Sequence, residues 1–184
     1  MGMRSAFTAL VLLFAGGIAA QDKDLRSLVA EDQAVRIHPE AKVARNDVDR
    51  IKLVLELIAK GAARTPEDKF NAALVLQHTP LEFREGKLVS VSPHNYLLAH
   101  YLALEAYEGG YEKARQLVAQ SIDRYLSFTE GRQKYGTNRI INQSTGEEEL
   151  VPVDRSVPDS ERAKYGIAPL AELLKKYREQ KPNP

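Results

Sequence analysis

Apolar residues recur with the 3.6-residue period of amphipathic helices along most of the chain. The pattern predicts helices at about residues 22–36, 47–60, 66–79, 93–108, 114–125 and 167–179. The helix over 93–108 is apolar on nearly all sides, and such a helix is covered by others rather than lying on a surface. It forms the first half of a helical hairpin, around which we expect the rest of the chain to be organised.

Two parts of the chain, residues 81–91 and 138–162, lack the 3.6-residue hydrophobic period of a helix. Residues 138–153 are predicted to form a β-hairpin, with its turn at residues 144–146. Residues 81–91 are predicted to be a loop of mixed character, within which GKLVSVS is one interpretation of a short strand. Residues 154–162 are polar and irregular. The predicted fold is therefore all-α, an irregular bundle of about six helices with a small β-hairpin near the C-terminus.

The first twenty residues have the pattern of a secretory signal peptide. Arg4 supplies a positive charge, an apolar run follows over residues 6–18, and small residues precede Gln21. The alternative is a transmembrane anchor, but the run is shorter than the ~20 residues that a span needs. We predict cleavage after Ala20, a single helical domain over residues 21–184, a periplasmic or secreted location, and no stable membrane anchor after cleavage.

Composition excludes several classes of function. Removing the first 20 of 184 residues leaves 164, with 25 basic and 25 acidic side chains, so the charge gives no case for nucleic acid. The absence of Cys excludes disulfides, thiol catalysis and Cys-type metal sites. No pair among the four His has a recognised zinc spacing, and neither a metal nor a cofactor is expected. His100 is interpreted as a packing residue within its helix.

Polar residues replace apolar ones on two predicted helix faces. Asp32 and Arg36 prolong the apolar stripe of the first helix and lie one turn apart. We interpret them as an ordinary surface ion pair, with an inward-facing pair as the alternative. Gln77 and His78 end the buried stripe of the third helix. His78 either binds the last carbonyls of that helix or belongs to a site.

The fifth helix and the loop after it carry further candidates. Asp123 falls nearly opposite the apolar stripe and Arg124 falls on its edge, so periodicity alone predicts that Asp123 is exposed. The loop 129–137 contains two Gly and would fold back on the helix, bringing Gln133 and Tyr135 to the Asp-Arg pair. The hypothesis is that Asp123, Arg124 and Tyr135 share one desolvated cluster.

Four short motifs connect these candidates in sequence order. They are Asp32-Gln33-Ala34-Val35-Arg36, Gln77-His78, Asp123-Arg124 and Gln133-Lys134-Tyr135-Gly136-Thr137. In order and spacing they resemble an uncharacterised family of bacterial exported helical proteins, a domain of unknown function with DQxxR, QH, DR and QxYGT motifs. That family usually has Gln after the Thr, where this chain has Asn138. The resemblance implies which positions matter and supplies neither a reaction nor a ligand.

Two classes of function fit the candidates. In a binding module, they would converge where the first, third and fifth helices meet and hold a small anionic ligand or a peptide. In a structural variant, they would lock the loop 129–137 onto the bundle. In the alternative, a hydrolase-type enzyme, His78 is a general base held by Asp32 or Asp123, and Arg124 stabilises negative charge. Because no catalytic motif such as G-x-S-x-G or H-E-x-x-H is present, we favour binding or structural use.

Overall fold

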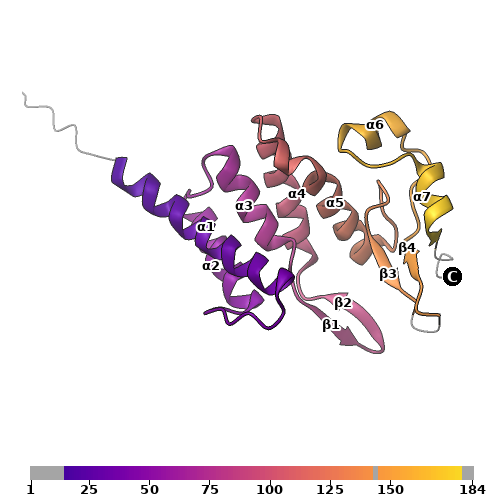
Figure 1. The fold of residues 1–184 in the computed structure, drawn as a ribbon, viewed down its shortest axis with the longest axis horizontal. Coiled ribbons are helices and arrows are strands. Elements are labelled where there is room, and N and C mark those ends of the chain that lie inside the picture. Colours follow the sequence, from indigo (N-terminus) through magenta and orange to yellow (C-terminus); the bar gives the residue numbers. More distant parts are fainter. Residues whose placement is uncertain (1–14, 143–144, 180–184) are drawn as a thin grey trace, which may run out of the picture.

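The computed structural model describes residues 15–142 and 145–179 (Figure 1). Over these ranges the chain is mostly helical, as the apolar pattern predicts. The helices are α1 (Ala15–Ile37), α2 (Asp47–Ala59), α3 (Pro66–Leu76), α4 (Pro93–Glu108), the 3₁₀ turn η1 (Glu112–Ala114), α5 (Arg115–Glu130), α6 (Asp159–Lys164) and α7 (Leu170–Lys176). The strands are β1 (Leu81–Arg84), β2 (Lys87–Ser90), β3 (Arg139–Ile141), β4 (Glu148–Leu150) and β5 (Arg178–Glu179).

The predicted starts of two helices are confirmed by their caps. The Asn46 side chain accepts a hydrogen bond from the N–H of Asp49 at 2.9 Å and so satisfies a donor in the first turn of α2. At α3, Thr65 and Asp68 form a reciprocal capping box, and Pro66 takes the first helical position. These local signals fix where α2 and α3 begin before any packing occurs.

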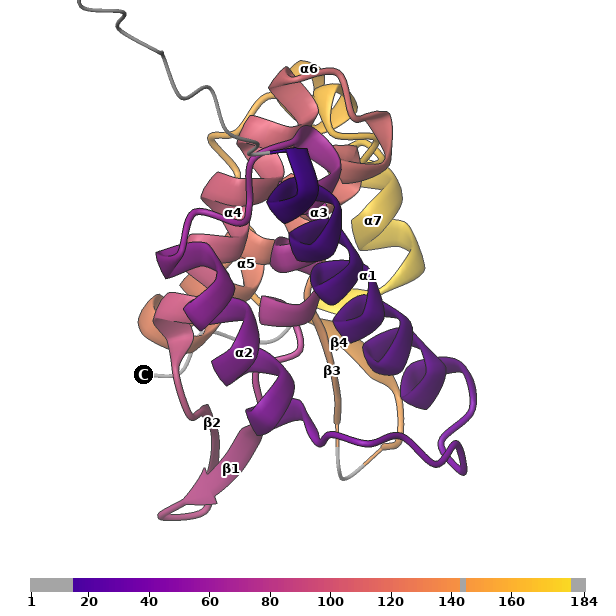
Figure 2. The same ribbon diagram turned by 90° about the vertical axis from the view of Figure 1, so that its left-hand side faces the viewer.

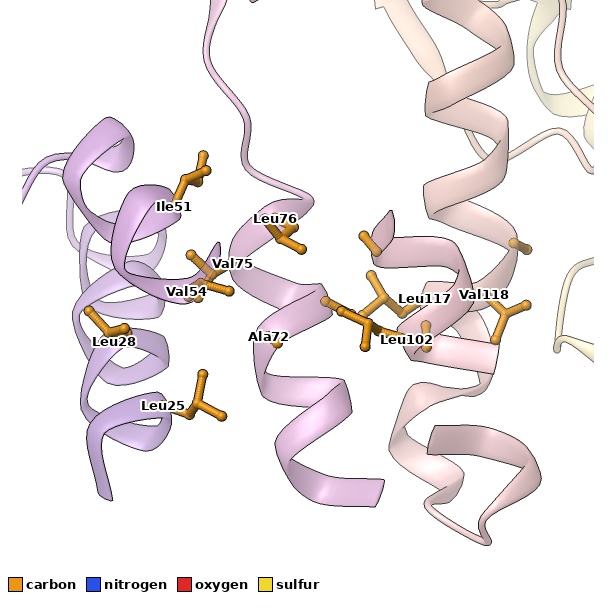
Figure 3. Packing of buried hydrophobic residues seen from close by; sticks show 14 of the residues in the cluster. Leu25, Leu28, Ile51, Val54, Ala72, Val75, Leu76, Leu102, Leu117 and Val118 are labelled. Atoms are coloured by element: carbon orange, nitrogen blue, oxygen red, sulfur yellow. The ribbon is translucent and has the colours of Figure 1, made fainter. Parts of the chain in front are cut away.

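The central helix of the bundle is α3. Figure 3 shows the apolar side chains of α1 and α2 facing one side of α3, and those of α4 facing the other side, followed by α5. Figure 2 shows α1 and α2 side by side in front of α3. Ala72 and Ala73 of α3 are completely buried, and their small size lets neighbouring helices approach closely. Each fully buried Leu or Val in this core contributes about 1.5–3 kcal/mol to folding.

The hairpin of α4 and α5 forms as predicted, but the cover of α4 is incomplete. Tyr96, Leu102 and Ala106 of α4 are buried against α3 and α5. Tyr101 nevertheless has 55% of its surface exposed. The prediction that α4 is covered on nearly all sides is therefore wrong at the face that carries Tyr101. The phenol ring of Tyr101 is amphipathic and tolerates contact with water.

Strands occur in two places rather than in one C-terminal hairpin. Residues 81–91, predicted as a loop, form the antiparallel hairpin β1–β2, which projects from the helices (Figure 1). Its two-residue turn has Glu85 at φ 50° and Gly86 at φ 76°. Positive φ at both positions defines a type I′ turn, which matches the twist of the flanking strands. The Gly at the second position is the only strong sequence signal for this turn.

The C-terminal part differs from prediction in its details. The predicted hairpin is present as the antiparallel pair β3–β4, although part of its turn, residues 143–144, lies outside the described residues. β5 adds to β4 in parallel and makes a three-stranded sheet. α6 falls where an irregular segment was expected. The predicted helix 167–179 shortens to α7, because Tyr177 turns extended and residues 178–179 pair with β4.

Most of the predicted signal peptide, residues 1–14, lies outside the described residues, as do residues 180–184. The remainder, from Ala15, already belongs to α1, which continues past the predicted cleavage point after Ala20 without a break. Along residues 15–142 and 145–179, no helix combines the length and apolar character that crossing a membrane requires. Export and cleavage stay predictions.

Candidate functional site

The structure separates the predicted site residues into two groups. One group, called here the Asp32 cluster, joins α1, α2 and the end of α3, and consists of Asp32, Arg36, Asp47, Arg50 and His78. The other, called the Asp123 cluster, joins α5 to the loop after it, and consists of Asp123, Gln133, Tyr135 and Thr137. The candidates therefore do not form one hydrogen-bonded cluster, although Arg124, next to Asp123, binds the main chain of Gln77, next to His78.

Asp32 is the centre of the first cluster, with only 1% of its side chain exposed. Its Oδ2 accepts a hydrogen bond from His78 Nδ1 at 2.7 Å and one from Gln33 Nε2 at 2.9 Å. Its Oδ1 lies 3.5 Å from Arg36 Nη2 and 3.8 Å from Arg50 Nε. The interpretation of a surface pair is wrong, because α2 and α3 cover this end of the α1 stripe and supply the partners that a buried carboxylate needs.

Arg50 is a member of this cluster that the sequence analysis did not select. Its side chain is also only 1% exposed, and it pairs with Asp47 and donates to the main-chain oxygen of Arg45. Arg36 also reaches Asp47, at 2.7 Å. A signal for Arg50 was present, because it lies four residues before the buried Val54 and thus on the same helix face.

His78 is oriented by Asp32 and is partly exposed. A carboxylate has no proton to donate when ionised, so Nδ1 carries the hydrogen and Nε2 of the neutral ring is an acceptor. No residue in the described ranges hydrogen-bonds to Nε2, and 23% of the side chain is exposed. His78 lies just beyond α3 and binds no carbonyl of that helix through its ring. The structure thus favours an interhelical contact over a helix-ending role for this ring.

Arg124 approaches the same region from α5. Its Nη1 donates to the main-chain oxygen of Gln77 at 2.8 Å, and its guanidinium lies 5.8 Å from the ring centroid of Tyr96. Burial lowers the pKa of Arg124. The Tyr96 phenol opposes this effect, and the positive charge of Arg36 adds to it. Arg36 and His78 both contact Asp32, and Arg124 binds the main chain of Gln77, the residue next to His78. We call Arg36, His78 and Arg124 the Arg–His face.

The charges around this face do not balance. The guanidinium groups of Arg36 and Arg50 face the two carboxylates of Asp32 and Asp47. Arg124 adds a third guanidinium, which has no carboxylate partner among the described residues, so a neutral His78 leaves one excess positive charge. The side-chain oxygen of the buried Gln77, next to His78 in sequence, has no hydrogen-bond partner within the described part of the chain. A buried acceptor without a partner costs about 1–3 kcal/mol.

The Asp123 carboxyl group holds the loop that follows α5. Its Oδ1 accepts the main-chain N–H groups of Lys134 and Tyr135, and its Oδ2 accepts the N–H and the hydroxyl of Thr137, all at 2.8 Å. Burial raises the pKa of Asp123, and the four hydrogen bonds oppose this by lowering it. The periodicity-based expectation of an exposed Asp123 is wrong, because the loop covers this face of α5, as the fold-back hypothesis required.

The other members of the Asp123 cluster also bind the main chain or residues of their own region. The Gln133 side chain donates to the oxygens of Asn138 and Val151 at 2.8 Å and accepts the N–H of Asn138 at 2.7 Å. These contacts use only the main chain of Asn138, so they do not depend on its side chain. The Tyr135 hydroxyl donates to Glu161 at 3.0 Å rather than reaching Arg124. Burial raises the pKa of Tyr135 to about 12.

Arg162 of α6 completes this region and was also missed by the sequence analysis. Its guanidinium is fully buried and donates to the main-chain oxygens of Tyr135, Val157 and Asp154. The surrounding segment is short and polar, so no apolar stripe marks Arg162 as an inward-facing residue. The cluster's hydrogen bonds are thus used to join the loop, α6 and the C-terminal sheet.

The protein is mostly helical and has two polar clusters. In the Asp123 cluster the carboxylate oxygens are fully hydrogen-bonded. In and beside the Asp32 cluster, Arg50 Nε and the side-chain oxygen of Gln77 have no hydrogen-bond partner among the described residues. No three His, Asp or Glu side chains within residues 15–142 and 145–179 gather as a metal site would require. No family model matches the chain, and neither the curated proteins nor the solved structures include a match to it. The resemblance to the exported family stays a prediction, and function must be inferred from the geometry.

Proposed function

We propose that the protein is a binding module for a small anionic ligand, held at the Arg–His face. The observation that carries this proposal is the partly exposed His78 ring, which a buried carboxylate fixes and which lies beside Arg36 on Asp32 and Arg124 on Gln77, with one excess positive charge. An ionised carboxylate or phosphate would supply the missing negative charge. Guanidinium groups bind such anions through paired N–H donors.

The contrast between the two clusters supports this assignment. The four hydrogen bonds of Asp123 all go to the adjacent loop, which is what a structural contact requires. His78 instead keeps one ring nitrogen without a partner in the described ranges and remains partly exposed. Arg36 has 36% of its side chain exposed and can contact a ligand without leaving Asp47. We therefore assign a structural role to Asp123 and a binding role to the Arg–His face.

Calorimetric titration with succinate and with inorganic phosphate tests the proposal. Binding should weaken about tenfold or more in Arg36→Gln, because this change removes a charge-assisted hydrogen bond. A similar loss is expected in His78→Ala, because the bound anion would draw a proton onto Nε2 and the resulting imidazolium would donate to it. His78→Gln keeps a side-chain N–H that can bind Asp32. If this variant folds normally and still binds weakly, the loss of affinity is due to the missing ring and not to unfolding. Arg132→Gln is the matched control, since this exposed arginine pairs with Glu130 and Asp154 instead.

Thermal unfolding of each variant shows whether the fold survives the substitution. Equal affinity in the parent protein, His78→Ala and Arg36→Gln would reject the Arg–His face as the binding site. So would an equal loss of affinity in Arg132→Gln, because that result would indicate unspecific attraction of the anion to positive charge.

A further inference from the structure

The four histidines of the chain have different surroundings, and only one is placed for proton transfer. His100 donates through Nδ1 to the main-chain oxygen of Val118 at 2.9 Å, as a packing residue would. His38 is exposed beside an exposed glutamate, and the ring of His94 packs against Tyr125. His78 alone contacts a buried carboxylate through one nitrogen, with its other nitrogen lacking a partner among the described residues.

We propose that His78 and Asp32 form a general-base pair that hydrolyses esters carrying a carboxylate near the scissile bond. This activity rests on the anion binding proposed above, because the Arg–His face would position the substrate through its carboxylate. Asp32 is a positioning residue, since it fixes the tautomer and direction of the His78 ring without touching substrate. Its second oxygen lies 3.5 Å from Arg36 Nη2 and 3.8 Å from Arg50 Nε, so two positive charges favour the ionised carboxylate in this position.

Water is the nucleophile in this reaction. No Ser or Thr hydroxyl of the described residues hydrogen-bonds to His78, and the chain has no Cys. His78 Nε2 takes a proton from a water molecule while the water oxygen bonds to the ester carbonyl carbon. The carbonyl electron pair moves to its oxygen, and the resulting oxyanion is stabilised by the positive charge of the Arg–His face.

Collapse of this tetrahedral intermediate completes the turnover. The carbonyl re-forms, the bond to the leaving oxygen breaks, and the imidazolium of His78 returns its proton to that oxygen. One ester and one water thus give one acid and one alcohol, with no other reactant. The side-chain oxygen of Gln77 is an acceptor that a donor group on the substrate would satisfy.

Hydrolysis of two matched chromogenic esters tests the proposal. The purified protein should turn over 3-carboxy-4-nitrophenyl acetate with saturation, and with at least about tenfold higher kcat/KM than the neutral 4-nitrophenyl acetate. His78→Ala should lower kcat about 100-fold or more, the usual contribution of a general base. Added imidazole should restore part of the lost rate in this variant. His38→Ala is the control and should keep the parent rate.

Asp32→Asn tests positioning rather than folding alone. It should lower kcat more than it raises KM, and it should shift the inflection in the pH dependence of kcat, which a purely structural loss would leave in place. The inference is overturned if the parent protein is no faster than His78→Ala, or if His38→Ala loses the same activity. Succinate binding without hydrolysis would reject the catalytic pair and leave the proposed binding function intact, whereas loss of both would reject both.

Discussion

At the scale of single residues, Asp123 has the clearest energetic role. Replacing it with Ala removes a carboxylate that accepts four hydrogen bonds and leaves buried main-chain N–H groups of the loop without partners. We expect Asp123→Ala to lower the free energy of unfolding by ~3–5 kcal/mol, as for other broken buried charge contacts. Urea unfolding followed by circular dichroism measures this change.

Two variants serve as comparisons for Asp123→Ala. Glu130→Ala, in the last turn of α5, removes an exposed ion pair with Arg132 and should cost at most ~1 kcal/mol. Tyr135→Phe removes only the hydroxyl bond to Glu161 and should cost about 1 kcal/mol. If Asp123→Ala were no more damaging than Glu130→Ala, the loop would not depend on the carboxylate.

Sequence reasoning selected several polar residues that the structure brings into contact, but it did not predict how they are covered. Asp32 and His78 were both candidates, and they form a direct contact. The choice between Asp32 and Asp123 as the partner of His78 could not be made from the sequence, because a helical wheel describes only the helix to which a residue belongs. Asp123 is buried by a loop, and Asp32 is buried by two other helices. Arg50 could have been found from its place on the α2 stripe, whereas nothing in the short segment around Arg162 marks it.

At the scale of elements, the loop after α5 depends on one glycine. Gly136 has φ 96°, and a Cβ atom at this position would lie 2.7 Å from the Cδ1 atom of Leu173 in α7. Gly136→Ala should therefore destabilise the protein through backbone strain and through the shift that the Leu173 side chain must make. Gly131→Ala is the matched control, since Gly131 has φ 67° and no atom within 4 Å of the added carbon.

The Gly131→Ala variant measures the cost of backbone strain alone, which is about 1–2 kcal/mol for an L-residue in the left-handed region. The prediction is that Gly136→Ala loses clearly more unfolding free energy than Gly131→Ala in the same urea titration. Equal losses would show that the Leu173 side chain moves aside without cost and that the close approach is unimportant.

Element boundaries were predictable where a local signal sets them. The caps at Asn46 and Thr65 are local, and α2 and α3 begin where they indicate. The β1–β2 hairpin is also local, since its strands pair across a two-residue turn, but the end of α7 depends on contacts made elsewhere. The extended end of α7 exists because β4 offers an edge to residues 178–179, and this edge is far away in sequence. The hydrophobic period alone predicted that the last helix continues to residue 179, beyond the observed end of α7 at Lys176.

At the scale of the whole molecule, stability should depend on the protonation of His100. Burial lowers the pKa of His100 from 6.5, the hydrogen bond to Val118 opposes this, Lys134 lowers the pKa further and Asp123 raises it. Because the folded pKa is depressed, this contribution to stability is complete above about pH 6.5 and is lost as the pH falls through the lower folded value.

The free energy of unfolding should therefore fall between pH 7 and pH 5, and the dependence should be weaker in His100→Gln. Parallel urea titrations at several pH values measure both. His38→Ala changes an exposed side chain and should keep the parent slope. An unchanged slope in His100→Gln would assign the pH dependence to other groups.

The position of α3 has a consequence for motion. Because α1 and α2 cover one side of this helix and α4 covers the other, its amides can reach water only when a large part of the bundle opens. The amide hydrogens of α3 should exchange with deuterium most slowly in the chain, at rates set by global unfolding. Those of β1–β2, which projects from the bundle (Figure 2), should exchange through local opening, orders of magnitude faster.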